Sequence, residues 1–182
     1  MTETQPRAAQ SASTQPSFAS ESRTVSWIPP GQADLTRLAG LDGLAQLEAM
    51  VGGDMPRPPI MDTLDFEDFR PEAGRVVVTM RAQEFHYNPL GTVHGGVLSA
   101  LLDTAAACSV HSTLAPGEGY TSLDLTVKFL RPVTVASGLL TCEGSVIQRG
   151  RRTALAQAQL TDEAGKLVAH ATSSCMIFAA TA

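Results

Sequence analysis

The segment from Asn88 to Gly96, together with Asp103 beyond it, brings together residue types that could polarise a carbonyl group and activate an attacking group. Gly95 and Gly96 stand at the start of a long apolar stretch, and glycine lets another group approach the backbone closely. If a helix begins there, its first amide groups are unpaired and lie at the positive end of the helix dipole. Such amides suit an oxygen atom that is gaining negative charge.

Asp103 is the candidate for the activating group. It lies seven residues beyond Gly96, which is about two helical turns, among apolar neighbours. A buried, unpaired carboxylate is costly, but one whose environment tunes it can act as a base or a nucleophile. Each feature alone has a structural alternative: a hydrogen-bonded aspartate, a capping His94, or glycines that permit close packing. Their coincidence favours a functional site.

One helix and a run of strands must position these residues. The window 97–110 is apolar on nearly every face, which predicts a helix surrounded by protein. Alternation of apolar and polar residues over 121–129 predicts one long strand with one solvent-exposed face. Further strands are predicted at 63–69, 75–81, 139–147, 153–161 and 167–178.

This order of elements predicts an α+β fold in which the helix packs on one face of an antiparallel sheet. A single helix covers only part of such a face. We therefore expect an oligomer that pairs sheet edges or sheet faces.

The N-terminal third divides into two parts before the main domain of residues 60–182. Residues 1–25 are rich in Ser, Thr, Gln and Ala without a hydrophobic period, which predicts a disordered leader. Residues 26–59 are expected to hold a helix over 34–50 and a proline-rich linker. Asp34 is the expected N-cap of this helix, and Gly52-Gly53 is its expected end.

Composition excludes several classes of protein. The net charge of −5 over 182 residues argues against a nucleic-acid partner. No apolar run approaches the roughly 20 residues that a membrane helix needs, and the first residues lack the apolar centre of a signal peptide. The three cysteines have no paired spacing and read as reduced core residues, so we expect a cytoplasmic protein with no disulfide and no metal site.

Several spaced motifs resemble those of one known family. The string Asn-x-x-Gly-x-x-His-Gly-Gly at 88–96, followed by Ala-Leu-Leu-Asp at 100–103, resembles the signature of the hot-dog thioesterases related to the phenylacetate-pathway enzyme PaaI. Thr-Ser-Leu-Asp at 121–124 and Phe-Leu-Arg-Pro at 129–132 resemble strands of that family. The resemblance covers roughly residues 60–178. It implies a hot-dog fold, in which a curved antiparallel sheet wraps one central helix.

The resemblance also implies a chemistry, the hydrolysis of an acyl- or aryl-acyl-CoA thioester without a cofactor. In this family the Gly95 position offers its amide to the thioester carbonyl, Asn88 helps hold that carbonyl or the attacking water, and His94 supports this arrangement. The Asp103 position comes from the opposite subunit as base or nucleophile, with Ser122 near the attacking water. Two subunits join their sheets edge to edge, and dimers commonly pair into a homotetramer, so that the active sites lie at the subunit interface.

Some assignments stay open in the sequence. Gly96 is a candidate substrate contact beside Gly95. Arg149, Arg151 and Arg152 cluster at one hairpin and could hold coenzyme A phosphates, although a solvated turn is the alternative. The walls of the acyl pocket are expected to include Ala105, Ala106, His111 and the N-terminal helix, and the hypothesis is that this helix caps the pocket.

Two other functions remain possible on the same fold. One is a hot-dog enoyl-CoA hydratase or dehydratase, and the other is a non-catalytic acyl-CoA-binding module. Neither a general-base route nor a mixed-anhydride route can be preferred from the sequence.

Overall fold

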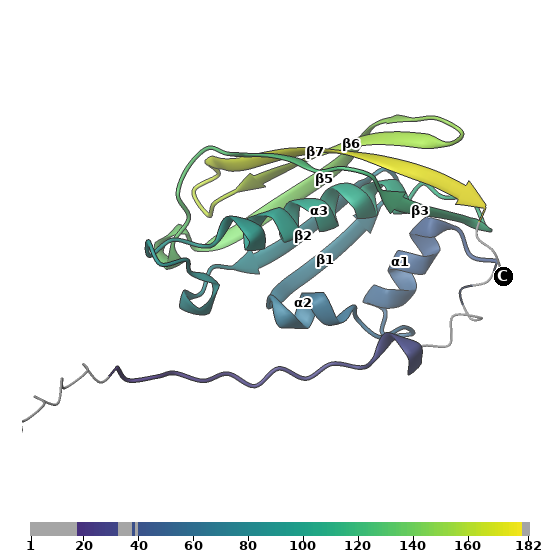
Figure 1. Ribbon diagram of the computed structural model, residues 1–182. Helices are drawn as coiled ribbons and strands as arrows, with labels where there is room; N and C mark the ends of the chain where they lie inside the picture. Colours follow the sequence, from purple (N-terminus) through teal and green to yellow (C-terminus); the bar gives the residue numbers. More distant parts are fainter. Residues whose placement is uncertain (1–17, 33–37, 39, 180–182) are drawn as a thin grey trace, which may run out of the picture.

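A seven-stranded antiparallel sheet curls around one long helix, α3 (Gly95–His111), in this computed structural model (Figure 1). The structure describes residues 18–32, 38 and 40–179. The strand order is β1-β2-β5-β6-β7-β3, and β4 also pairs with β7. This arrangement confirms the predicted α+β hot-dog fold. The strands are β1 Phe66–Glu72, β2 Arg75–Arg81, β3 Glu118–Ser122, β4 Thr126–Phe129, β5 Leu139–Arg149, β6 Thr153–Thr161 and β7 Leu167–Ala179.

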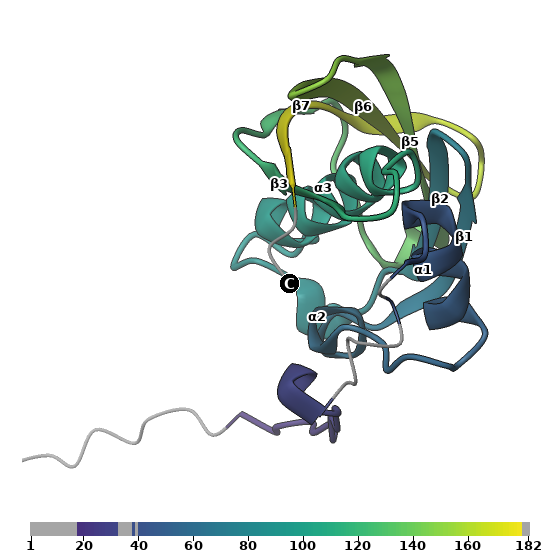
Figure 2. The same ribbon diagram turned by 90° about the vertical axis from the view of Figure 1, so that its right-hand side faces the viewer.

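Helix α3 lies in the hollow of the sheet because it is apolar around most of its circumference (Figure 2). Leu101, Leu102 and Val110 are fully buried. Alanines on the facing strand β6, such as Ala156 and Ala158, are also fully buried and bring little bulk to the contact. Small side chains on one layer against large ones on the other allow the helix and the sheet to pack at interior density.

Helix α3 and the sheet approach each other closely at Gly144 on β5. A Cβ atom there would lie only 2.0 Å from the carbonyl oxygen of Ala105 on α3. Only a residue without a side chain fits at that distance. Gly144 therefore sets how deeply α3 sits in the sheet.

The predicted helix over 34–50 is wrong for residues 40–42, which are not helical, whereas residues 34–37 and 39 lie outside the described part of the chain. The helix α1 runs only from Gly43 to Val51, and Asp42 is its N-cap, because the Asp42 side chain accepts a hydrogen bond of 2.9 Å from the amide of Ala45. Gly40 has a φ of +86°, which a continuing right-handed helix does not allow. The proposed cap Asp34 lies outside the described residues. The end is as predicted, with Gly52 as C-cap.

The chain between α1 and the first strand holds a short helix that the sequence did not predict, α2 (Pro59–Thr63). The first strand, expected over 63–69, accordingly begins later, at Phe66, and runs through Pro71. Proline is tolerated there because β1 is the edge of the sheet, where one side of the strand makes no ladder hydrogen bonds.

The single strand predicted over 121–129 is two strands, β3 and β4, which is a second correction. Both pair with β7, but residues 123–125 between them leave the ladder. The Asp124 side chain accepts a hydrogen bond of 3.0 Å from the amide of Ser174, and the Asp124 carbonyl accepts one of 2.8 Å from the buried hydroxyl of Ser173. These bonds to side-chain groups replace ladder bonds and interrupt the strand.

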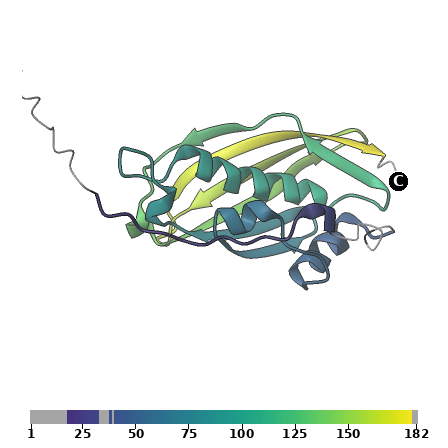
Figure 3. The same ribbon diagram turned by 60° about the horizontal axis from the view of Figure 1, so that its bottom comes forward.

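The N-terminal segment lies along α2 (Figure 3). Residues 18–25 form no helix or strand, and Arg23 donates hydrogen bonds to the carbonyls of Asp62 and Thr63 at 2.9 and 3.0 Å. The Arg23 guanidinium also stacks on the Phe85 ring, 4.2 Å from its centroid. The predicted disorder of residues 1–25 stays a prediction, because residues 1–17 lie outside the described part. Within the described residues, none of the helices combines the length and the apolar character that spanning a membrane requires.

The close approach at Gly144 generates a test of the fold. Gly144→Ala places a methyl group against the backbone of α3, which cannot yield as a side chain can, so we expect a loss of at least about 1–3 kcal/mol in the free energy of unfolding. The measurement is urea unfolding followed by circular dichroism. Gly31→Ala is the matched control, because no atom lies within 4 Å of the added carbon. Equal midpoints for the two variants would contradict this account of how the helix and the sheet pack.

Candidate active site

The loop before α3 is tied to the body by a buried histidine, His86. Its Nδ1 accepts a hydrogen bond of 3.1 Å from the amide of Gln83, and its Nε2 lies 3.1 Å from the carbonyl oxygen of Leu64, so Nε2 carries the proton. Burial lowers the pKa of His86, which keeps the ring neutral. The carbonyl of His86 in turn accepts the amide of His94 at 2.8 Å. The start of α3 is thus fixed through His86.

Asn88 folds the loop that follows. Its side-chain oxygen accepts the amides of Leu90 and Thr92 at 2.8 and 3.4 Å, and its side-chain nitrogen donates to the Thr92 hydroxyl at 3.0 Å. Gly91 takes a positive φ of +76°, as the tight turn requires. One of the two N–H groups of the Asn88 amide is left for another partner. The residue therefore organises the loop whatever else it does.

The first turn of α3 presents one free amide. His94 is the N-cap, and its Nδ1 accepts the amide of Gly96 at 2.9 Å. The Gly96 amide is thus occupied, whereas the amide of Gly95 has no acceptor among the described residues. Gly95 lines a surface groove of about 350 Å³ together with Asn88 and Phe129. An oxygen atom bound in this groove could accept a hydrogen bond from the Gly95 amide, which lies at the positive end of the helix dipole.

Asp103 lies in the middle of α3, half-buried, with the hydroxyl of Ser122 from β3 at 3.5 Å from its Oδ1. Burial raises the pKa of Asp103 above its usual range, and the hydrogen bond from Ser122 acts in the opposite direction. A carboxylate with a raised pKa is a stronger base than an ordinary one. The structure therefore brings Ser122 close to Asp103 within one chain.

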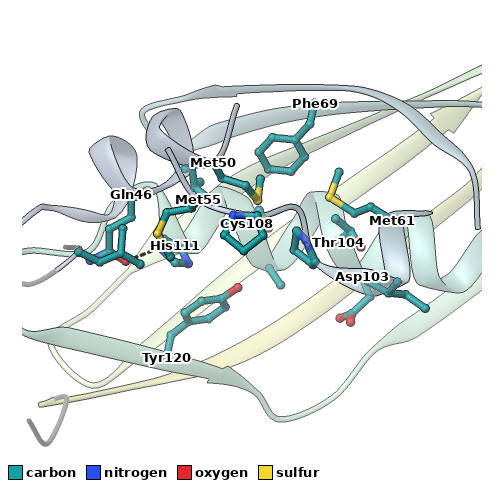
Figure 4. Close-up of a pocket in the computed structure, with 16 residues that line it drawn as sticks. Gln46, Met50, Met55, Met61, Phe69, Asp103, Thr104, Cys108, His111 and Tyr120 are labelled. Carbon is teal, nitrogen blue, oxygen red and sulfur yellow. Dashed lines mark hydrogen bonds between the residues drawn. The ribbon is translucent and has the colours of Figure 1, made fainter. Parts of the chain in front are cut away.

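Asp103 opens into an apolar pocket of about 400 Å³ (Figure 4). One wall is α3 and β3, and the other is α1, α2 and the segment between them. His111 and the N-terminal helix line the pocket as predicted, but Ala105 and Ala106 do not, because both are fully buried. The side chains lining the pocket are Leu38, Gln46, Leu47, Met50, Met55, Pro56, Pro58, Ile60, Met61, Phe69, Asp103, Thr104, Ala107, Cys108, His111 and Tyr120.

Several of these residues were missed by the sequence analysis. Ala107 and Cys108 follow Asp103 by four and five positions, and a spacing of four places a residue on the same side of a helix. That signal could have found them. Gln46 and Tyr120 carried no comparable signal, since they reach the pocket from elements remote in the sequence.

The Gly95 amide and the Asp103 carboxylate, the two groups that could take part in a reaction, do not meet within one chain. Gly95 and Asp103 lie on the same straight helix, eight residues apart, which separates them by about 12 Å along its axis. They also open into different hollows, the groove and the pocket. A single carbonyl group cannot contact both residues of the same chain.

The three arginines of the β5–β6 hairpin differ in their surroundings. Arg149 pairs with Glu118 and donates to the Thr113 hydroxyl at 3.1 Å. Arg151 and Arg152 are exposed beside a shallow hollow at the ends of β3 and β7. Only the latter two have charges left for a phosphate group. Among the described residues, no three His, Cys, Asp or Glu side chains are grouped so that they could hold a metal ion.

Comparison with known proteins places this chain in a family. Residues 90–169 match the model of the thioesterase superfamily. The phenylacetic acid degradation-related protein of Ralstonia eutropha JMP134 is 36% identical, with 71% of this chain and 97% of that one covered and a TM-score of 0.65. The E. coli PaaI protein is 26% identical, with coverage of 78% and 98% and a TM-score of 0.66.

Curated relatives agree with these structures. Human acyl-coenzyme A thioesterase 13 is 29% identical over 97 residues, which are 53% of this chain and 68% of that protein. The 1,4-dihydroxy-2-naphthoyl-CoA hydrolase of Listeria monocytogenes is 29% identical over 109 residues, which are 60% of this chain and 87% of that enzyme. With its curled sheet around one helix, this chain belongs to the hot-dog thioesterases of the thioesterase superfamily.

Proposed function

We propose that this thioesterase hydrolyses an acyl-coenzyme A thioester to a free acid and coenzyme A. The observation that carries the proposal is the half-buried carboxylate of Asp103, with its raised pKa, at the mouth of an apolar pocket. The pocket offers a place for an acyl group, and the carboxylate lies where the acyl carbonyl would be. Relatives that are named acyl-coenzyme A thioesterase and naphthoyl-CoA hydrolase support the same substrate class.

The proposed chemistry needs a polarised carbonyl and an activated attacker. The amide of Gly95 donates a hydrogen bond to the carbonyl oxygen as this oxygen gains negative charge. Asp103 then takes a proton from water while the water oxygen bonds to the carbonyl carbon. The carbon–sulfur bond breaks, and the coenzyme A thiolate leaves and takes up a proton. In the other route Asp103 itself attacks, and water hydrolyses the resulting mixed anhydride. Neither route needs a cofactor.

We propose that Gly95 and Asp103 of one site come from two copies of the chain, because they are about 12 Å apart on one helix. The free edge of the sheet at β3 and β4 offers an interface. Apolar side chains there are exposed in the single chain, with Leu123 at 58% and Phe129 at 53%. Pairing this edge with its copy would cover them. A dimer satisfies the site, and the homotetramer stays a prediction.

Other residues receive supporting roles in this proposal. Ser122 orients the Asp103 carboxylate or the attacking water, and His94 keeps the Gly96 amide occupied so that the Gly95 amide faces the groove. Asn88 has one amide N–H left for the carbonyl oxygen or the water. Gly96 stays a predicted substrate contact through its exposed backbone.

Surface charges and the compartment complete the proposal. We assign the phosphates of coenzyme A to Arg151 and Arg152, and we give Arg149 a structural role because Glu118 neutralises it. The cytoplasm is the proposed compartment, since Cys108, Cys142 and Cys175 are free thiols.

The direct test is thiol release from a panel of aryl, short-, medium- and long-chain acyl-CoA substrates. Asp103→Asn keeps the size of the side chain but removes the base, so we expect kcat to fall by at least about 100-fold with the circular dichroism spectrum unchanged. Glu48→Gln, an exposed change on α1, is the control. A wild-type protein that binds acyl-CoA without releasing thiol would point to a binding module. Hydration of an enoyl-CoA without thiol release would point to a hydratase.

The role of the Gly95 amide and the two-copy site can be tested together. Gly95→Pro removes the amide donor at a position where a helix accepts proline, and His94 before it is already extended, with a ψ of 134°. We expect a loss of about 100- to 1,000-fold in kcat. Gly95→Ala adds a carbon at the same place, against the exposed Phe129 ring, but keeps the amide, and should lose far less.

Co-expression of Asp103→Asn and Gly95→Pro chains then reports on the site composition. A mixed dimer has one site with both groups intact, so random pairing should restore about a quarter of wild-type activity. Inactive mixtures, despite mixed dimers seen by mass spectrometry, would show that each site uses one chain alone.

The pH dependence of the rate follows from the surroundings of Asp103. The base works only when ionised, so activity falls as pH drops through the pKa of Asp103, and burial places this acid limb above the ordinary value of 3.8. Ser122→Ala removes the hydrogen bond that lowers this pKa, so the limb of the kcat/KM profile should move to higher pH. Thr121→Ala, a neighbouring hydroxyl, should leave the limb in place. A shift to lower pH in Ser122→Ala would contradict the assignment.

A further inference from the structure

The pocket continues far beyond the carboxylate that the chemistry requires. It follows one side of α3 from Asp103, past Ala107, to His111 (Figure 4). At that end the His111 Nε2 lies 3.0 Å from the side-chain oxygen of Gln46 on α1, and the Gln46 nitrogen donates to the Leu41 carbonyl at 3.1 Å. Two hydrogen bonds therefore hold Gln46 across the end of the pocket.

The wall between these two ends is mostly apolar and carries no charge. The part of the wall from α1 to α2 contributes three methionines, Met50, Met55 and Met61. Methionine adapts to the shape of an apolar ligand. The ionisable groups beyond Asp103 stay neutral near pH 7. Burial raises the pKa of Cys108 to about 12, raises the pKa of Tyr120 as well, and lowers the pKa of His111. A charged ligand tail would find no counter-charge here.

The distance between the Asp103 and His111 ends of the pocket indicates how long an acyl chain it can hold. Asp103 and His111 are eight residues apart on α3, which is about 12 Å along the helix axis and room for an extended chain of about eight to ten carbons. The volume of about 400 Å³ lies within the range of ligand pockets. A single aromatic ring next to the carbonyl would leave the far half of the pocket unfilled.

We propose that the pocket selects an uncharged, unbranched acyl chain of about eight to ten carbons, and that Gln46, held by His111, is the residue that sets this length. The proposal rests on the proposed acyl-CoA thioesterase function and goes beyond it. It makes α1 a specificity element: the helix places a polar, hydrogen-bonded pair where the apolar channel ends, and a longer chain would have to displace that pair.

The test measures kcat/KM for saturated acyl-CoA substrates of 2–16 carbons, with phenylacetyl-CoA and succinyl-CoA for comparison. We expect kcat/KM to rise roughly fourfold for each added methylene up to about ten carbons and then to fall. Succinyl-CoA, with its terminal charge, should be among the poorest substrates. Gln46→Ala should move the optimum to longer chains, and Ala107→Leu, which fills the middle of the pocket, should move it to shorter ones. Glu48→Ala on the exposed face of α1 is the control.

Binding separates failure of this proposal from failure of the proposed function. Dissociation constants of the same acyl-CoA series are measured by calorimetry with the Asp103→Asn protein. If no substrate releases thiol from the wild type, the thioesterase function fails, but an optimum near ten carbons in binding that moves with Gln46→Ala still supports the pocket assignment. Affinity and kcat/KM that do not depend on chain length, or an optimum that Gln46→Ala leaves in place in a folded protein, would overturn it.

Discussion

Helix α3 is apolar on nearly all sides and must be shielded from water, and the other elements are arranged around it to bury it. The curved sheet buries Leu101, Leu102 and Val110, and Gly144 lets the helix sit deep enough for that contact. The segment from α1 to β1 covers the opposite side, but less tightly. The pocket lies in this second layer, and Asp103 faces it. The ionisable residue of the site thus stands where apolar cover is incomplete, which explains why its carboxylate is tolerated in a core helix.

The rigidity of the same helix limits how the site can be assembled. A helix fixes the distance between two of its residues, so the free amide of Gly95 and the carboxylate of Asp103 cannot approach each other. The exposed apolar edge at β3 and β4 offers a surface on which a second chain could bring the missing group. In this proposal the same dimer contact serves two purposes. It buries the exposed apolar edge at β3 and β4, and it brings the Gly95 amide of one chain to the Asp103 carboxylate of the other.

Local pattern predicted the regular parts of the molecule well. The strands at 75–81 and 153–161 have the predicted bounds, and the central helix gained only a few residues, because His94 caps it earlier. The errors arose where contacts between distant residues decide the structure. Asp124 interrupts the edge strand through Ser173 and Ser174, 49 and 50 residues away. In the site, the motifs pointed to Asp103 and Ser122 as separate candidates, and the structure adds that they lie in contact within one chain. The partnership of Gln46 with His111, 65 residues apart, has no sequence pattern that could reveal it.

The division of the site between two stretches of chain has an evolutionary consequence. Gly95 and Asp103 lie within residues 90–169, the part that matches the superfamily, whereas much of the pocket wall comes from α1, α2 and β1 before it. Substitutions in that earlier stretch can reshape the pocket without touching Gly95 or Asp103. Related enzymes can therefore diverge in the molecules they accept by exchanging or remodelling this N-terminal stretch, while the helix and sheet that hold Gly95 and Asp103 stay as they are.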